Sequence, residues 1–133
     1  MDWNKEYELG IPELDAQHRQ LLECLEKLEA AEDEKAGELA VYFVLTQLDA
    51  YSRVCFVVEE ILMRLFDYPG LAAHAKEHAD FAARLIALEQ SELRHEVHGE
   101  TRKFLHDWLA QHIGVSDRRF ARFLLDAGAI SPD

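Results

Sequence analysis

The sequence predicts an all-α protein, an antiparallel up-down four-helix bundle with an N-terminal arm and a short C-terminal helix. Apolar residues recur at three- and four-residue steps over four segments, which is the period of an amphipathic helix. Prolines stand only at positions 12, 69 and 132, outside these segments' interiors, and no stretch alternates with the period of two that a strand needs. Short connections favour antiparallel neighbours. We expect residues 1–133 to form a single domain.

The first helix is expected to begin at Pro12, because proline is favoured in a first helical turn. Its apolar stripe runs from Leu14 to Leu28, and the polar stretch AAEDEKAGE follows. A second helix is predicted over about residues 38–66, and the turn sequence DYPG ends it. The inner stripe predicted for this second helix consists of Val41, Val44, Leu48, Tyr51, Cys55, Val58 or Glu59, and Leu62.

The third and fourth helices are separated by the polar stretch QSELRHEVHGE. Gly114 is expected to interrupt the fourth helix, and Ser116 to cap a short fifth helix that ends at Gly128. The first ten residues would lie across the bundle as an arm, anchored by Trp3 and Tyr7. The inward residues predicted for the third and fourth helices are Leu71, His74, His78, Phe81, Leu85, Leu88, Thr101, Leu105, Trp108 and His112.

Composition narrows the functional classes. The net charge of −12 argues against a nucleic-acid or anionic-lipid partner, because both require a basic surface. The N-terminus does not resemble a secretion signal, and the longest apolar runs, such as AVYFVL, are too short to cross a bilayer. Cys24 and Cys55 do not make a disulfide framework. We therefore expect a cytoplasmic protein without a nucleic-acid or membrane partner.

Each predicted inner stripe also carries ionisable residues. His18 lies in the first stripe, Glu59 with Cys55 in the second, a histidine pair (His74, His78) in the third and His112 in the fourth. Residues four apart share a helix face. Burying such groups unpaired costs on the order of several kcal/mol, and a bound cation removes that penalty. Two carboxylates from different helices can bridge two metal ions. Imidazole and carboxylate suit iron, with zinc and manganese as alternatives.

Asp117 lies five residues after His112, a spacing that turns its side chain away from His112 on a regular helix. The two can meet only if the helix is distorted or ends between them. Taken singly, each candidate has an ordinary structural explanation: an inward His18 as a hydrogen-bonded core residue, or Glu59 as part of a helix surface. Candidates on all four stripes together favour a metal site.

The remaining conspicuous residues are given structural roles. Three histidines lie off the inner pattern or near a loop and are read as surface residues: His95, His98 and His106. Three large residues are read as core packing: Met63, Phe66 and Trp108. Cys24 is assigned no role.

These segments resemble the bacterial hemerythrins. The likeness covers nearly the whole chain, through LGIPELDAQH, YSRVCFVVEEILM, YPGLAAHAKEHADF and WLAQHIGVSD. It implies a non-haem di-iron centre that binds O2 reversibly, as a bound peroxide, at the second iron. The resemblance places His74, His78 and His112 on the first iron and His18 on the second, with Glu59 and Asp117 bridging. Apolar candidates for the lining of the oxygen pocket are Leu21, Leu22, Leu62, Trp108 and Ile113.

Cys55 departs from the family pattern, which has histidine four residues before the bridging glutamate. It can ligate the second iron as a thiolate, leave that iron with an open position, or leave the second site weak; a buried cysteine can also simply fill space. The side chain should point at the metal, which favours ligation. Three functions stay open: oxygen binding, storage or sensing; a redox enzyme acting on peroxide, nitric oxide or a small substrate; and a metal-holding or metal-sensing protein.

Overall fold

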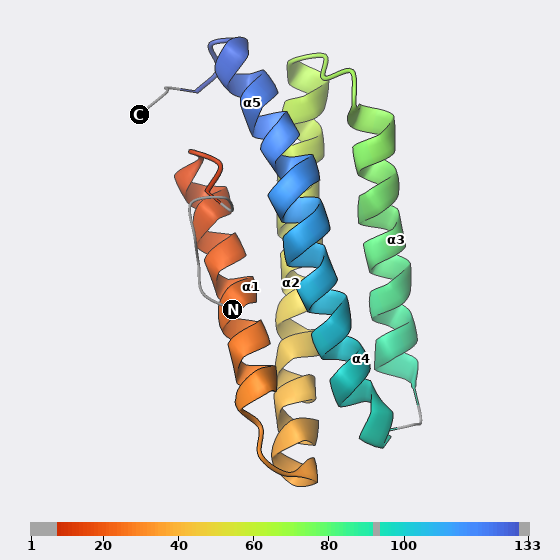
Figure 1. Cartoon of the computed structure of the whole chain (residues 1–133). Coiled ribbons are helices and arrows are strands. Elements are labelled where there is room, and N and C mark those ends of the chain that lie inside the picture. Colours follow the sequence, from red (N-terminus) through yellow and green to blue (C-terminus); the bar gives the residue numbers. More distant parts are fainter. Residues whose placement is uncertain (1–7, 92–93, 131–133) are drawn as a thin grey trace.

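The computed structural model describes residues 8–91 and 94–130, which form a bundle of four helical rods (Figure 1). The predicted four-helix bundle is confirmed. The expected arm, with Trp3 and Tyr7, lies outside the described residues. The first three rods are α1 (Pro12–Ala30), α2 (Glu34–Leu65) and α3 (Leu71–Gln90), and the fourth comprises α4 (Arg94–Asp107), η2 (Trp108–Asp117) and α5 (Arg118–Asp126).

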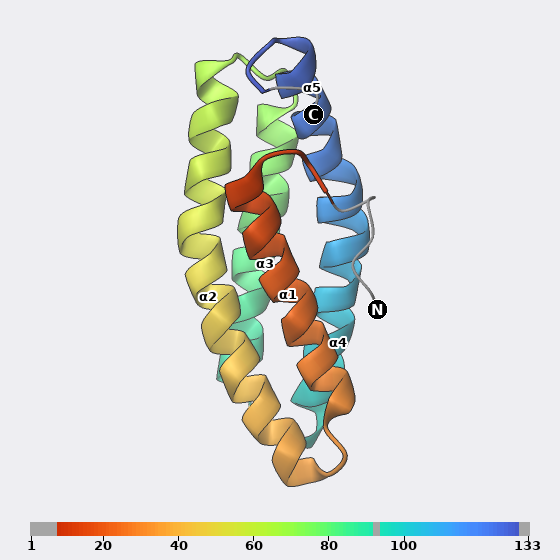
Figure 2. The same cartoon turned by 90° about the vertical axis from the view of Figure 1, so that its left-hand side faces the viewer.

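The rods run along one long axis, and consecutive rods are joined at alternate ends (Figures 1 and 2). α2 contacts α1, α3 and α4, while α1 also packs against α4 and η2. Each rod therefore places one face in a shared interior, so that side chains from all four can meet there.

Local polar contacts fix the helix starts. Pro12 opens α1 as predicted, and the buried Asp15 carboxylate accepts the backbone N–H groups of Leu9 (2.8 Å) and Gly10 (3.2 Å). α2 begins at Glu34, a turn earlier than predicted, because the Asp33 side chain caps it by accepting the Ala36 N–H at 2.7 Å. An N-cap of this kind satisfies backbone donors that have no partner inside the helix.

The predicted break at Gly114 is wrong. The fourth rod continues through Gly114 as a ten-residue π-helical segment, and Ser116 does not cap a separate helix; its hydroxyl donates to Glu77 of α3 instead. In a π-helix the hydrogen bonds join residues five apart. Side chains five apart therefore lie one above the other, and His112 and Asp117 share the inward face without a break.

The apolar core has two parts. The larger cluster fills most of the bundle, and a smaller one at the α5 end contains Met63, Phe120 and Leu124. Glu59 lies between them along α2. Of the two alternatives for the inner stripe of α2, Glu59 is the buried residue and Val58 points outward. The prediction that Phe66 packs in the core is wrong, because its side chain is exposed.

The three histidines outside the predicted inner stripes differ in how far they are buried. His106 is exposed, as predicted. His98 is half-buried rather than on the surface, and its Nε2 lies 2.7 Å from the Leu28 carbonyl oxygen. The side chain of His95 lies outside the part of the chain that the structure describes. His98 thus ties the start of α4 to the end of α1.

Replacing Asp15 with alanine should lower the free energy of unfolding by about 1–2 kcal/mol, because the Leu9 and Gly10 N–H groups lose their acceptor. Urea denaturation of the purified variant measures this loss. Glu13→Ala, an exposed acid in the same helical turn, is the control and should change stability by less than about 0.5 kcal/mol. Equal losses in both variants would contradict a specific role for Asp15.

Candidate metal centre

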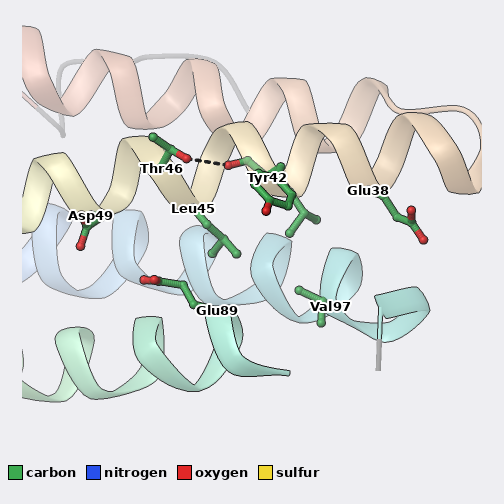
Figure 3. A pocket seen from close by; sticks show the side chains of 8 residues that line it. Glu38, Tyr42, Leu45, Thr46, Asp49, Glu89 and Val97 are labelled. Atoms are coloured by element: carbon green, nitrogen blue, oxygen red, sulfur yellow. Dashed lines mark hydrogen bonds between the residues drawn. The ribbon is translucent and has the colours of Figure 1, made fainter. Parts of the chain in front are cut away.

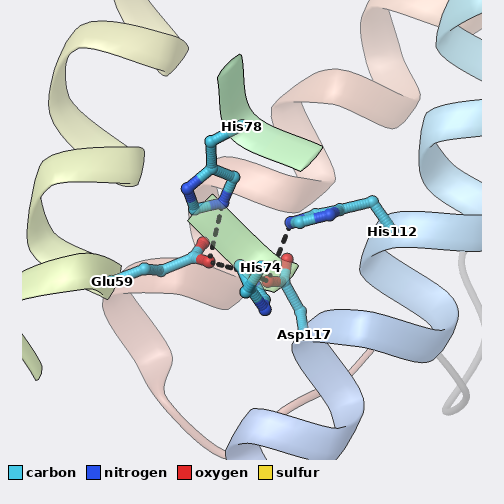
Figure 4. Close-up of side chains that lie close together, drawn as sticks. All are labelled: Glu59, His74, His78, His112 and Asp117. Atoms are coloured by element: carbon cyan, nitrogen blue, oxygen red, sulfur yellow. Dashed lines mark hydrogen bonds and ion pairs between the residues drawn. The ribbon is translucent and has the colours of Figure 1, made fainter. Parts of the chain in front are cut away.

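Five buried side chains from α2, α3 and η2 converge between the rods (Figure 4). Each offers one possible ligand atom, and these atoms all lie within 4.8 Å of one another. This first group consists of Glu59, His74, His78, His112 and Asp117. The i, i+4 spacing of His74 and His78 places both imidazoles on one face of α3, and the π-helical turn of η2 supplies the other pair.

A second group of buried side chains adjoins the first. It consists of His18 from α1 with Cys55 and Glu59 from α2, whose candidate ligand atoms again lie within 4.8 Å of one another. The Cys55 thiol donates to Glu59 Oε2 across 3.5 Å. His18 Nε2 lies 3.5 Å from Asp117 Oδ2. All the residues that the sequence proposed as metal ligands therefore fall in these two groups.

The two carboxylates face both groups at once. Glu59 Oε1 lies 3.0 Å from His74 Nε2 and 3.4 Å from His78 Nε2, while its Oε2 accepts from Cys55. Asp117 Oδ1 lies 2.9 Å from His74 Nε2 and 3.1 Å from His112 Nε2, while its Oδ2 faces His18. Each carboxylate thus presents one oxygen to each group, as a bridging ligand would.

Outer carboxylates orient two of the imidazoles. His78 Nδ1 donates to Glu60 Oε2 at 2.8 Å, and His112 Nδ1 donates to Glu77 Oε1 at 2.8 Å. Ser116 also donates to Glu77. Because each Nδ1 carries the proton, each Nε2 presents a lone pair to the interior. Imidazoles that bind metals in proteins are commonly held in this way.

The interior of the site contains buried polar atoms that have no hydrogen-bond partner in the described part of the chain. Within residues 8–91 and 94–130, both ring nitrogens of His18, Nε2 of His78 and of His112, and both oxygens of Asp117 are buried without a hydrogen-bond partner. Unpartnered buried polar atoms are rare in native proteins. Convergent lone pairs repel one another unless a cation lies between them, so these donor atoms fit metal ions.

The pKa values of the buried residues show that the site favours positive charge. Burial alone would lower the pKa of His74, but the neighbouring carboxylates of Asp117 and Glu59 raise it to about 9. Burial would raise the pKa of Asp117, yet the neighbouring His112 and His74 hold it well below its usual range. Burial, together with the charges of Glu59 and Asp117, raises the pKa of Cys55. Without a metal, the site holds a proton on His74 and keeps Cys55 a thiol.

Aromatic side chains pack against two imidazoles of the first group. Phe56 stacks on His78 at 3.8 Å between ring centroids, and Trp108 stacks on His112 at the same distance. The Trp108 Nε1–H donates to the Tyr51 hydroxyl at 3.2 Å. Four of the predicted pocket residues are buried and the fifth, Leu62, is half-buried; the four are Leu21, Leu22, Trp108 and Ile113.

Sequence reasoning missed the outer residues of the site. Glu60 and Glu77 each stand next to a proposed ligand in the chain, and Phe56 stands next to Cys55. Adjacent residues on a helix point about a quarter-turn apart, so an acid next to an inward residue can accept a hydrogen bond from the outer nitrogen of a nearby imidazole. Adjacency to a proposed ligand was therefore the only feature of the sequence that could have indicated these acids. Which of the many exposed acids does so depends on how the helices are rotated in the bundle.

Comparison with known proteins agrees with this geometry. The family described as "Hemerythrin HHE cation binding domain" matches residues 9–124. The chain belongs to the hemerythrin family. The matched segment contains every residue of both groups, so hemerythrin membership and the clustered ligand atoms point to the same part of the chain.

Individual hemerythrins match over most of their length. A bacteriohemerythrin of Stenotrophomonas maltophilia is 31% identical over 90% of this chain and 78% of its own. One of Clostridium acetobutylicum is 27% identical over 89% of this chain and 96% of its own. A myohemerythrin of Riftia pachyptila is 25% identical over 89% and 88%, respectively. The resemblance inferred from the sequence segments is thereby confirmed.

Glu77→Ala should weaken cation binding by about 10–100-fold, because His112 loses the acceptor that fixes its tautomer and orientation. Anaerobic titration of the metal-free protein with ferrous iron measures the affinity. Asp80→Ala is the matched control, since Asp80 is an exposed acid of the same helix that pairs with Lys76. An unchanged affinity in the Glu77 variant would show that its contact with His112 is incidental.

Proposed function

We propose that this hemerythrin holds two iron ions and binds O2 at them. The observation that carries this proposal is the position of the two carboxylates, each with one oxygen toward each group of donors. A single cation would use only one side of this arrangement. Two cations would use both, and Glu59 and Asp117 would be their shared ligands.

The remaining donors divide between the two ions. The three imidazoles of the first group (His74, His78 and His112) would complete one coordination shell, while His18 and Cys55 would serve the other. Imidazole and carboxylate ligands suit iron, and a thiolate is also compatible with it. The second ion would have fewer protein ligands than the first, which leaves room there for a small exogenous ligand.

When bound, the two ferrous ions would supply the electrons for reversible O2 binding. The protein's own residues set the conditions. Leu21, Leu22 and Ile113 are buried in the main apolar cluster and would help to keep bulk water out of the interior. Glu60 and Glu77 hold the imidazole orientation. A dry, preorganised pocket of this kind protects a reactive ligand from stray protons.

Cys55 is proposed as a ligand of the second ion. Its sulfur lies among the atoms of the second group, and it is fully buried. The raised pKa of the thiol comes from burial and from the negative charges of Glu59 and Asp117. A bound cation reverses that balance and favours the thiolate. Thiolate ligation supports redox chemistry at this site as a second candidate function, because an electron-rich ligand favours the ferric state.

Metal analysis with absorption spectra of the reduced and air-exposed protein tests the proposal. The wild type should contain about two irons per chain and show a sulfur-to-iron charge-transfer band when oxidised. Cys55→Ser should lose the band and bind its second iron about 10–100-fold more weakly. Cys55→His should bind and release O2 over repeated cycles.

Cys24→Ser provides the matched control, because Cys24 is the other buried thiol and lies outside both groups. It should keep the iron content and the band of the wild type. Identical spectra for the wild type and Cys55→Ser would contradict ligation by sulfur. An iron content near one in every variant would contradict the two-ion site itself.

A further inference from the structure

The outward face of α2 carries many apolar side chains although it is exposed to solvent. Nine of the eleven exposed large hydrophobic residues in the described part of the chain lie on α2 or at its C-cap, with 38–72% of their surface accessible. We call them the α2 outer face: Leu39, Tyr42, Phe43, Val54, Val57, Val58, Ile61, Leu65 and Phe66. By length and composition α2 could even cross a membrane, although the core helix of a bundle meets the same criterion.

The area of this face matches a protein interface. Each side chain exposes on the order of 100 Å², given the ~150–250 Å² of a whole aromatic residue, so the face exposes roughly 900 Å². The largest apolar patch on a typical monomer covers about 300–600 Å². Standard interfaces bury about 800 Å² per partner. The α2 outer face is therefore large enough to hold a stable partner.

The spacing of the exposed positions along α2 is symmetric about Ala50. Counting from this exposed residue, positions lie four, seven and eleven residues away in both directions. These steps keep a residue on one helix face. The resulting stripe runs Leu39, Phe43, Thr46, Ala50, Val54, Val57, Ile61, with small side chains at its middle and larger ones toward its ends.

We propose that the α2 outer face is the interface through which two copies of this protein associate, with their α2 helices antiparallel and crossing at Ala50. A two-fold interface must be self-complementary, so each contact occurs twice. The symmetric stripe meets this condition. Leu39 then faces Ile61 of the second copy, Thr46 faces Val54, and Ala50 faces its own counterpart, which lets the helices approach closely at the centre.

The charged residues beside the stripe also favour a second copy of this protein as the partner. A groove of about 450 Å³ runs beside the stripe, and three carboxylates line it, Glu38, Asp49 and Glu89 (Figure 3). Arg53 lies on the same flank of α2 as this groove, and in the free chain it pairs with its own Asp49 at 3.0 Å. The antiparallel pairing sets Arg53 of the second copy opposite Gln47, within a turn of Asp49. Each copy thus offers an arginine to the acidic groove of the other.

Sedimentation equilibrium over a range of protein concentrations tests association. The wild type should form dimers, and Ala50→Glu should raise the dissociation constant at least about tenfold, because two carboxylates would meet at the two-fold axis. Arg53→Asp should also weaken the dimer, and adding Asp49→Arg to it should restore association. Ile86→Glu, at an exposed apolar position on α3, is the matched control and should leave the constant unchanged.

Disulfide trapping tests the antiparallel orientation. Ala50→Cys should cross-link to itself on oxidation. Thr46→Cys and Val54→Cys should not cross-link alone, since equivalent positions are then about 12 Å apart along the axis, beyond the reach of a disulfide. A mixture of these two variants should cross-link between them. The wild type serves as the baseline, because Cys24 and Cys55 are buried.

Three results would overturn the proposal. One is a protein that stays monomeric at every concentration up to its solubility limit. Another is self-cross-linking by Thr46→Cys and Val54→Cys, which would indicate a parallel pair. The third is a monomer that binds phosphatidylcholine vesicles through this face, with binding lost in Ala50→Glu, which would make the occupant a lipid surface. None of these measurements depends on bound metal, so the proposed oxygen-binding function can fail independently.

Discussion

The structure depends on a buried cluster of histidine and carboxylate side chains whose lone pairs point toward one another. Imidazole nitrogens and carboxylate oxygens from all four rods converge in two adjoining groups, within 4.8 Å of one another in each, and several of them have no hydrogen-bond partner among the described residues. In a low-dielectric interior this arrangement is unfavourable unless positive charge is added. In the metal-free chain, a proton on His74 supplies part of that charge. Bound cations would supply the rest, so folding and metal binding should reinforce each other.

Much of the surrounding architecture serves to hold those donors in place. Glu60 and Glu77 fix two imidazoles from outside, and Phe56 and Trp108 stack on the same two rings. The π-helical segment belongs to this framework as well. Such segments are rare and frequently occur at functional sites. Here it brings Asp117 onto the face of His112, while the Ser116 contact with Glu77 joins the distorted turn to α3.

What the sequence could predict follows from local geometry. The pairs Cys55–Glu59 and His74–His78 need only α-helical spacing to share a face, so the sequence alone predicts both pairs. The five-residue step to Asp117 required a distortion, and Gly114 suggested a break, whereas contacts between rods favour a continuous π-helix. Glu60 and Glu77 could not be distinguished from other surface acids, because their partners depend on how the helices rotate. The symmetric stripe on α2 likewise could not be predicted, because the sequence does not show which apolar residues of α2 are buried and which are exposed.

Anomalous diffraction at the iron edge, from crystals of protein purified with its own metal, tests directly whether two irons lie between Glu59 and Asp117. Two peaks are expected there, one facing His74, His78 and His112 and the other facing His18 and Cys55. A single peak would leave the second group of donors without a cation. The absence of any anomalous peak between the two carboxylates, in a protein that still folds with these side chains converged, would contradict a two-iron centre.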